Sequence, residues 1–192
     1  MKIGKSKEEL DREFETVVTE HERMIYHTAL SFLHNEEDAK DATQTVFLKA
    51  YRAWHSFRHA SSPATWLYSI CKNTCNDIWR RKNGGFDLPL SVLEESNLSP
   101  ADCSETTEET VLRHEARIAV WDAINLLSPP MREALILRDI EGYSYALIAQ
   151  MTDTDEGTVK SRLHRARASL TKILKDGNYF FPEPSNTEKE GM

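Results

Sequence analysis

Residues 157–167 read GTVKSRLHRAR and begin a stretch in which apolar side chains recur at helical spacing. Val159, Leu163, Ala166, Leu170 and Ile173 step by four, three, four and three, which makes one apolar face. Between Gly157 and Lys175 the chain carries six basic residues and no acidic one. The pattern predicts a helix over about 155–175 with one face in a core and a basic face elsewhere.

A short apolar pattern at 144–151 precedes this helix across a tight turn, which predicts a helix-turn-helix. The second helix of that motif can enter a major groove, where Lys and Arg neutralise phosphates and Arg can pair with guanine. The alternative is a solvated basic face without a ligand. Upstream, the spacing predicts a helix from about 110 to 127, an end and a new start at Ser128-Pro129-Pro130, a helix over 131–139, and a turn at Glu141-Gly142.

The N-terminal part also shows only helical spacing. It predicts three helices: one over about 10–28, one that begins after an N-cap at Asn35 and ends near residue 57, and one over about 65–82. No convincing alternating strand pattern occurs, so the fold class is all-α. The third helix interleaves aromatic, amide and basic side chains on its predicted outward positions, which suits the stacking of unpaired bases. The alternative is that Trp66 and Trp79 cover the hydrophobic core. The outward positions are Trp66, Tyr68, Lys72, Asn73, Asn76, Trp79, Arg80 and Arg81.

The net charge of −7 is concentrated in one place, because residues 83–127 hold nine acidic and two basic side chains. Gly, Pro, Ser and Thr are frequent over 84–107, and basic residues are absent there. We therefore expect two small helical domains joined by a flexible acidic linker. The expected boundaries are 1–83 for the first domain, 84–107 for the linker, 108–176 for the second domain and 177–192 for a disordered tail.

Several classes of protein are disfavoured by the composition. No apolar run approaches the ~20 residues that cross a bilayer, and no apolar segment follows the N-terminal lysines as in a secretory signal. Three cysteines are too few for a disulfide framework, so we expect a cytoplasmic location. Cys71 falls on an apolar stripe and is predicted to be a reduced core residue. No nucleophile, base and orienting group come together, so we expect no catalytic site, no metal and no cofactor.

Two segments resemble a known family. LSPPMREALILRDIEGYSYALIA (127–149) with GTVKSRLHRAR is similar to region 4 of a bacterial sigma factor. DAKDATQTVFLKAYRAW (38–54) with FRHASSPATWLYSICKNTCNDIWRR (57–81) is similar to region 2. The order of the two segments and the linker between them resemble the extracytoplasmic-function group of the sigma-70 family, over roughly residues 10–175.

The resemblance implies a noncatalytic subunit that gives RNA polymerase its promoter specificity and melts the −10 element. Its implied partners are core polymerase (the β′ clamp helices and the β flap), promoter DNA as a −10 single strand and a −35 duplex, and an anti-sigma factor. The implied core-polymerase contacts are Asp38, Asp41, Gln44, Phe47 and Trp54. The implied −10 contacts are Arg58, His59, Ser61, Ser62, Trp66, Asn73, Asn76 and Arg80. The implied −35 contacts are Thr158, Lys160, Ser161, Arg162, His164, Arg165 and Arg167, of which Arg162 and Arg167 are assigned to the DNA backbone.

Residues 153–156, Asp-Thr-Asp-Glu, depart from the apolar turn that is usual in this family. Asp tolerates the left-handed turn conformation and acids favour a helix N-terminus, but these carboxylates would face phosphates. We therefore expect weak or unusual −35 recognition. We also expect Asp77 to orient Arg80 or Arg81. A further hypothesis is that the linker acids, with Glu108 and Glu109, partly mimic RNA inside the polymerase.

Two other readings remain open. A stand-alone helix-turn-helix regulator would bind duplex DNA without polymerase, but it leaves the third helix's aromatic and basic face unexplained. An acidic helical adaptor would bind proteins alone, but it leaves the basic face of 158–167 without a purpose.

Overall fold

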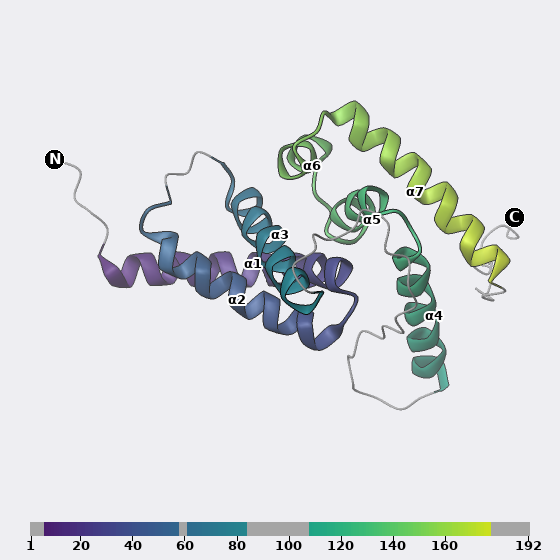
Figure 1. The fold of residues 1–192 in the computed structure, drawn as a ribbon, viewed down its shortest axis with the longest axis horizontal. Coiled ribbons are helices and arrows are strands. Elements are labelled where there is room, and N and C mark those ends of the chain that lie inside the picture. Colours follow the sequence, from purple (N-terminus) through teal and green to yellow (C-terminus); the bar gives the residue numbers. More distant parts are fainter. Residues whose placement is uncertain (1–5, 58–60, 84–107, 178–192) are drawn as a thin grey trace, which may run out of the picture.

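The computed structural model describes residues 6–57, 61–83 and 108–177 of the 192-residue chain. Within those ranges the chain forms helices and no strand, which confirms the all-α prediction (Figure 1). In chain order the elements are α1 (Lys7–Leu33), α2 (Glu36–Trp54), α3 (Pro63–Lys82), α4 (Glu108–Asn125), α5 (Pro129–Leu135), a π-helical turn η1 (Ile136–Ile140), α6 (Tyr145–Thr152) and α7 (Glu156–Asp176). The predicted linker 84–107 and residues 178–192 of the predicted tail lie outside the described residues.

Helices α1, α2 and α3 pack against one another as a three-helix bundle. Side-chain caps define where each helix begins. Ser6 and Glu9 form a capping box at the start of α1, and Asn35 accepts a hydrogen bond from the Asp38 amide at the start of α2. Ser62 caps α3 and Pro63 occupies its first turn, so α3 begins two residues before the predicted Thr65.

The core of the bundle is apolar and fully packed around α3. Leu67 and Cys71 are inaccessible to solvent, which confirms the prediction that Cys71 is a core residue. Tyr68 is 1% exposed, so the prediction that it faces outward is wrong. Tyr68 is buried because the outward direction of α3 at this point is covered by the C-terminal half of the chain, which helical spacing alone does not reveal.

The second group of helices begins with α4 and follows the predicted breaks closely. Ser128 precedes Pro129 and Pro130 in the first turn of α5, as expected. Helix α5 runs without interruption into η1, where the Glu141 amide bonds the Ile136 carbonyl at 3.0 Å. Gly142, at φ 77°, then turns the chain towards α6, because this left-handed conformation favours glycine.

Helices α6 and α7 form the predicted helix-turn-helix (Figure 1). Asp153 occupies the left-handed conformation at φ 51° and ψ 52°, as its place in the turn predicts. Asp155 is the N-cap of α7 and accepts hydrogen bonds from the Thr158 amide at 2.8 Å and the Thr158 hydroxyl at 2.6 Å. The acidic residues of the turn therefore have a structural role, because Asp153 turns the chain and Asp155 caps the start of α7.

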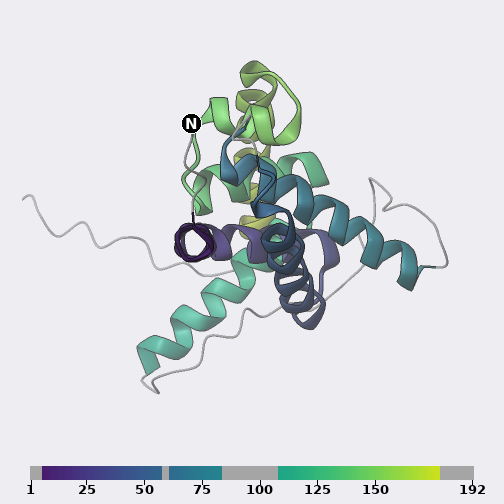
Figure 2. The same cartoon turned by 90° about the vertical axis from the view of Figure 1, so that its left-hand side faces the viewer.

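The two groups of helices are in direct contact. Helix α6 packs on α3, and α5 and η1 pack on α1, so that one apolar core continues across both groups. In both views α5, α6 and α7 lie on one side of the α1–α3 bundle, while α4 extends away from it (Figures 1 and 2). The two predicted domains thus form one packed body.

Candidate nucleic-acid and protein interfaces

Helix α7 separates its apolar and polar residues as the sequence predicts. Val159, Leu163 and Ala166 are at most 1% exposed. We define the α7 polar face as the four exposed side chains Lys160, Ser161, His164 and Arg165. All four belong to the predicted −35 set, and they present donors and positive charge to solvent on the helix that a helix-turn-helix inserts into a groove.

The other predicted −35 residues are held by contacts inside the protein. The Arg167 guanidinium pairs with both Asp139 oxygens at 2.6 and 2.9 Å, so part of its charge is already balanced within the protein. Arg162 is only half exposed, and its charge acts on the buried Glu133 carboxyl. Thr158 is half-buried, with its hydroxyl on Asp155. These placements weaken the case for Arg162 as a backbone contact.

Aromatic stacking positions two cations beside the α7 polar face. Tyr145, at the start of α6, lies under the Arg138 guanidinium at 4.7 Å and under the Lys160 ammonium at 5.6 Å. Such contacts orient a cation without neutralising it. Arg165 in turn donates from its Nη2 to the Ser161 hydroxyl at 3.2 Å, so two base-reading candidates support each other.

The exposed side of α3 carries part of the predicted −10 set. Asn73 and Arg80 are exposed and Asn76 is half-buried. Ser61 is exposed, while the Ser62 hydroxyl accepts from the Thr65 amide as the α3 cap. Arg58 and His59 lie outside the described residues.

Trp66 is half-buried in an aromatic cluster rather than fully available to a base. Its ring centroid lies 4.7 Å from Phe57 and 6.0 Å from Trp54. The structure therefore supports the alternative in which Trp66 covers the core, while its remaining exposed surface borders the Ser61 end of α3.

Asp77 lies close to a cation on the neighbouring helix α2 as well as to the end of its own helix. Its carboxylate lies 3.6 Å from the Lys49 ammonium on α2, and Arg81 bonds the Asp77 backbone carbonyl instead of its side chain. Lys49 thus reaches the Asp77 carboxylate from α2, and the expectation that Asp77 orients Arg80 or Arg81 stays a prediction. Spacing within α3 does not show this neighbour.

Helix α2 presents some of the predicted polymerase contacts and buries another. Asp41 and Gln44 are exposed and Phe47 is half-buried. The Asp38 carboxylate pairs with Lys82 at 2.5 Å. Trp54 is 7% exposed and packs against Phe14 and Phe57, so it has no surface to offer a partner and we remove it from the contact set.

Two exposed apolar residues on α2 lie on the same side as two of the predicted polymerase contacts but are not among those contacts. Leu48 is 57% and Tyr51 is 45% exposed. With Asp41 and Gln44 they step by three, four and three along the helix, so all four share one side, which we call the α2 face. That spacing was available in the sequence and identifies Leu48 and Tyr51 as contact candidates.

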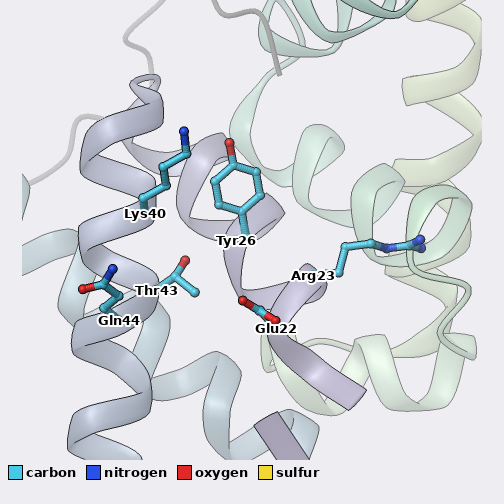
Figure 3. Close-up of a pocket in the computed structure, with 6 residues that line it drawn as sticks. All are labelled: Glu22, Arg23, Tyr26, Lys40, Thr43 and Gln44. Atoms are coloured by element: carbon cyan, nitrogen blue, oxygen red, sulfur yellow. The ribbon is translucent and has the colours of Figure 1, made fainter. Parts of the chain in front are cut away.

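A groove of about 390 Å³ lies beside the α2 face, between α1 and α2 (Figure 3). Gln44 and Thr43 border it from α2, and Tyr26 and Glu22 from α1. Figure 3 shows Arg23, also at its edge, extending away from α2 towards the C-terminal helices. The groove gives the α2 face a concave border.

The described ranges contain neither a metal-binding cluster nor a membrane-spanning helix. In them no three His, Cys, Asp or Glu side chains gather as a metal site. Among the described helices, none combines the length and apolarity that crossing a bilayer requires. Cys71 and Cys75 are both buried thiols, and a hydrogen bond from Cys75 together with burial raises the pKa of Cys71.

Comparison with known proteins agrees with the two-part architecture. The family described as sigma-70 region 2 matches residues 17–84, and the family described as sigma-70, region 4 matches residues 117–170. The first match contains α2 and α3 with the residues implied for polymerase and the −10 strand. The second contains the helix-turn-helix.

Relatives match most of the chain. The RNA polymerase sigma-H factor of Pseudomonas aeruginosa is 35% identical over 85% of this chain and 86% of its own length. The ECF RNA polymerase sigma factor SigM of Mycobacterium tuberculosis is 35% identical over 84% of this chain and 76% of its own. The ECF RNA polymerase sigma-E factor of Escherichia coli is 35% identical over 69% of this chain and 72% of its own length.

Two solved structures share the fold. The sigma factor RpoE of Bartonella quintana, in complex with the anti-sigma factor NepR, aligns with TM-score 0.62 and 26% identity over 85% of this chain and 98% of that one. CnrH, in complex with the cytosolic domain of CnrY, aligns with TM-score 0.60 and 25% identity over 86% of this chain and 90% of that one. The chain therefore belongs to the extracytoplasmic-function group of the sigma-70 family, the noncatalytic subunits that direct RNA polymerase to promoters.

Proposed function

We propose that three separate faces of this chain divide the work of a sigma factor. The α2 face binds core polymerase, the exposed side of α3 holds the −10 strand, and the α7 polar face reads the −35 duplex. The observation that carries this assignment is the helix-turn-helix, whose second helix exposes Lys160, Ser161, His164 and Arg165 and no acid among them.

On α7, Arg165 is the proposed base-reading residue. Its guanidinium is exposed and can pair with a guanine through two donors, whereas Lys160 and His164 contribute charge and single donors. Arg167 is proposed to reach a phosphate after leaving Asp139. The Asp155 carboxylate, used as a helix cap, still adds negative charge near the DNA, which supports weak −35 recognition.

On α3, the proposed −10 contacts are Asn73, Asn76 and Arg80, with Ser61 and the exposed part of Trp66 at the helix start. Amides can hydrogen-bond the edges of unpaired bases, and the exposed guanidinium can meet the strand's phosphates. Arg58 and His59 remain in the proposed set on the family resemblance alone.

On α2, the proposed polymerase contact combines charge with apolar area. Asp41 and Gln44 supply polar contacts, and Leu48 and Tyr51 supply exposed apolar surface of the kind that anchors protein interfaces. We propose the β′ clamp helices as the partner, with a side chain entering the groove beside Gln44. Region 4 is proposed to meet the β flap.

The location and a further partner follow from the family. We propose that the chain works in the cytoplasm, where core polymerase is found. Two structural relatives were solved as complexes, one of them with a protein described as an anti-sigma factor. We propose that this chain too is controlled by an anti-sigma factor.

Separation of function tests the assignment. Arg165→Ala removes the proposed guanine contact and leaves the α2 face untouched. It should weaken binding to −35 duplex DNA by about 1–3 kcal/mol, or roughly 5- to 150-fold, with core binding unchanged. Leu48→Ala together with Gln44→Ala should weaken binding to core polymerase and leave binding to the −35 duplex unchanged. Lys172→Ala, an exposed change on the same helix as Arg165, is the matched control.

Binding to core polymerase and to labelled duplex is measured by fluorescence anisotropy for each variant. Loss of core binding in Arg165→Ala would show that the α7 polar face is misassigned. Duplex binding by the free chain, with no association with core polymerase, would instead favour the stand-alone regulator.

A further inference from the structure

Tyr145 is the first residue of α6 and lies where two other elements meet that helix. Helix α6 packs on both η1 and α7. Ser144 caps α6 by accepting a hydrogen bond from the Leu147 amide, so the backbone that carries Tyr145 is fixed in the first turn. The Tyr145 side chain is half-buried, which leaves part of its ring at the surface. The ring is therefore within reach of side chains from η1 and from α7.

Arg138 of η1 braces the ring. Its guanidinium carbon lies 4.7 Å from the ring centroid of Tyr145, and its Nη1 donates to the Tyr143 carbonyl at 2.7 Å. A planar guanidinium can stack on an aromatic face while its donors bond elsewhere. Because Arg138 is itself tied to the backbone, the contact fixes the orientation of the Tyr145 ring.

The polar end of Tyr145 is linked to α7. Asp139 holds the Arg167 guanidinium through both carboxylate oxygens, at 2.6 and 2.9 Å. A hydrogen bond from Asp139 and its charge raise the pKa of Arg167, and Tyr145 adds to that rise through its own hydrogen bond to the guanidinium. Tyr145 is thus held at its ring by η1 and at its hydroxyl by α7.

Lys160 is the exposed cation that this braced ring contacts. Its ammonium lies 5.6 Å from the ring centroid of Tyr145, within the range of a cation–π contact. The ring attracts the ammonium through its quadrupole and leaves the positive charge in place. A lysine side chain otherwise samples many rotamers, and ordering it on binding costs conformational entropy.

We propose that Tyr145 is a positioning residue of the −35 interface, whose braced ring holds the Lys160 ammonium ready for a phosphate of the duplex. The inference rests on the proposed assignment of the α7 polar face to DNA. The residues that the family resemblance implies for the −35 element all lie between 158 and 167, so Tyr145 is not among them. Tyr145 acts through Lys160 and not by its own contact with DNA.

The expected consequence is a gain in affinity without a gain in charge. A lysine that meets a phosphate releases the same counterions whether or not it is held beforehand. Ordering the side chain in advance removes part of its entropy cost, which corresponds to about fivefold in affinity. The effect requires an aromatic ring, because an aliphatic side chain of similar size has no quadrupole to attract the cation.

The first measurement is duplex binding by the full chain, followed by fluorescence anisotropy. The probe is a labelled pool of short random-sequence duplexes at low salt, because a phosphate contact does not depend on the base sequence. Tyr145→Leu should weaken binding about fivefold. Tyr145→Phe keeps the ring and should stay within about twofold of wild type. Circular dichroism checks that each variant is helical.

A double-mutant cycle separates positioning from a purely structural role. In a Lys160→Ala background Tyr145→Leu should have almost no further effect, because the cation that the ring holds is gone. In the matched control background Lys172→Ala, an exposed change on the same helix, the full loss should remain. A loss of equal size in both backgrounds would overturn the proposal, because Tyr145 would then act through packing. Weak binding by Tyr145→Phe would also overturn it, since the hydroxyl and not the ring would be required.

A second measurement, made without DNA, tests the placement of Lys160. Protons held over an aromatic ring resonate upfield, so NMR spectra of the chain with isotope-labelled lysine report the contact, and Lys160→Ala identifies its signal. The upfield shift should be present in wild type and in Tyr145→Phe and absent in Tyr145→Leu. The same Lys160 shift in Tyr145→Leu as in wild type would overturn the positioning role and leave the assignment of the α7 polar face standing. A shift that requires the ring, in a chain that binds no duplex, would instead count against the proposed function of α7, and the part of Tyr145 in DNA binding would fail with it.

Discussion

Glu133 lies at the contact between the two helix groups, and its ionisation is coupled to that contact. Burial raises the pKa of its carboxyl to about 7, and the nearby Arg162 guanidinium opposes the rise. Tyr68 from α3 faces the same carboxyl. Because the buried form prefers the proton, the contact between the two helix groups is strengthened at low pH and weakened as the pH rises through about 7.

His34 acts in the opposite sense. Arg132 can only donate, so His34 Nε2 has to accept and the imidazole is neutral. Burial, and then the Arg132 charge, lower the pKa of His34 to about 4. Contacts that need a neutral His34 are fully present above its ordinary value of 6.5 and weaken as the pH falls towards 4. The two residues offset each other in the wild type between about pH 4.5 and 6.5.

Glu133→Gln should remove the contribution of Glu133 and leave the opposite pH dependence of His34 visible. The amide still accepts from Tyr68 but takes up no proton. Between pH 8 and pH 6, the free energy of unfolding of the wild type should rise by about 1.4 kcal/mol relative to Glu133→Gln, as follows from the raised pKa. Urea denaturation followed by circular dichroism across this range gives the difference, and His34, His27-Glu141 and His21-Tyr143 are present in both proteins. Identical pH profiles of the two proteins would show that Glu133 does not take up a proton when it is buried.

At the scale of single elements, α2 shows where helical spacing predicts function and where it does not. Spacing places Trp54, Phe47 and Asp41 on a helix correctly, but it does not show which neighbour covers each one. Trp54 is buried because Phe14 from α1 and Phe57 from the following loop close over it. The identity of the buried residue depends on a contact between distant parts of the chain.

Trp54→Ala should therefore act on folding. Removing a buried Trp side chain destabilises a protein by about 3–5 kcal/mol. Trp54→Phe keeps most of the buried apolar side chain, so it should lose much less stability than Trp54→Ala. Urea denaturation followed by circular dichroism measures both. A Trp54→Ala chain of unchanged stability that no longer binds core polymerase would restore Trp54 to the contact set.

The helix-turn-helix is the element that the sequence predicts best. Its caps and turns depend on local residue chemistry: Ser144 and Asp155 as N-caps, Asp153 in the left-handed region, Gly142 in the preceding turn. What spacing misses are the partners from other elements, such as Asp139 for Arg167 and Lys49 for Asp77. Those partners decide which predicted site residues remain available to a ligand.

Asp155 provides a test at this scale. Hydrogen bonds from Thr158 lower the pKa of Asp155, so the charged cap stabilises α7 above pH 3.8 and loses this effect as the pH falls through the lowered value. Asp155→Ala should expose the Thr158 amide to several-fold faster hydrogen exchange. Asp155→Asn keeps an acceptor without the charge, so its exchange should stay slow while −35 duplex binding strengthens at low salt. Weaker duplex binding by Asp155→Asn would mean that the carboxylate is no obstacle to DNA.

At the scale of the whole molecule, the chain is a pair of helical groups with different tasks and a shared core. The sequence predicts the two groups and their order, because each has its own periodicity and its own break residues. It does not predict that they pack together, since that depends on Arg132 reaching α1 and on Tyr68 reaching α5.

The most direct measurement is reconstituted transcription with purified core polymerase, this chain and a pool of promoter fragments, followed by mapping of the transcript starts. We expect starts that depend on the chain and that share sequence near −10 and a weaker preference near −35. If the chain neither associates with core polymerase at low ionic strength nor yields any chain-dependent start, it does not act as the promoter-specificity subunit described above.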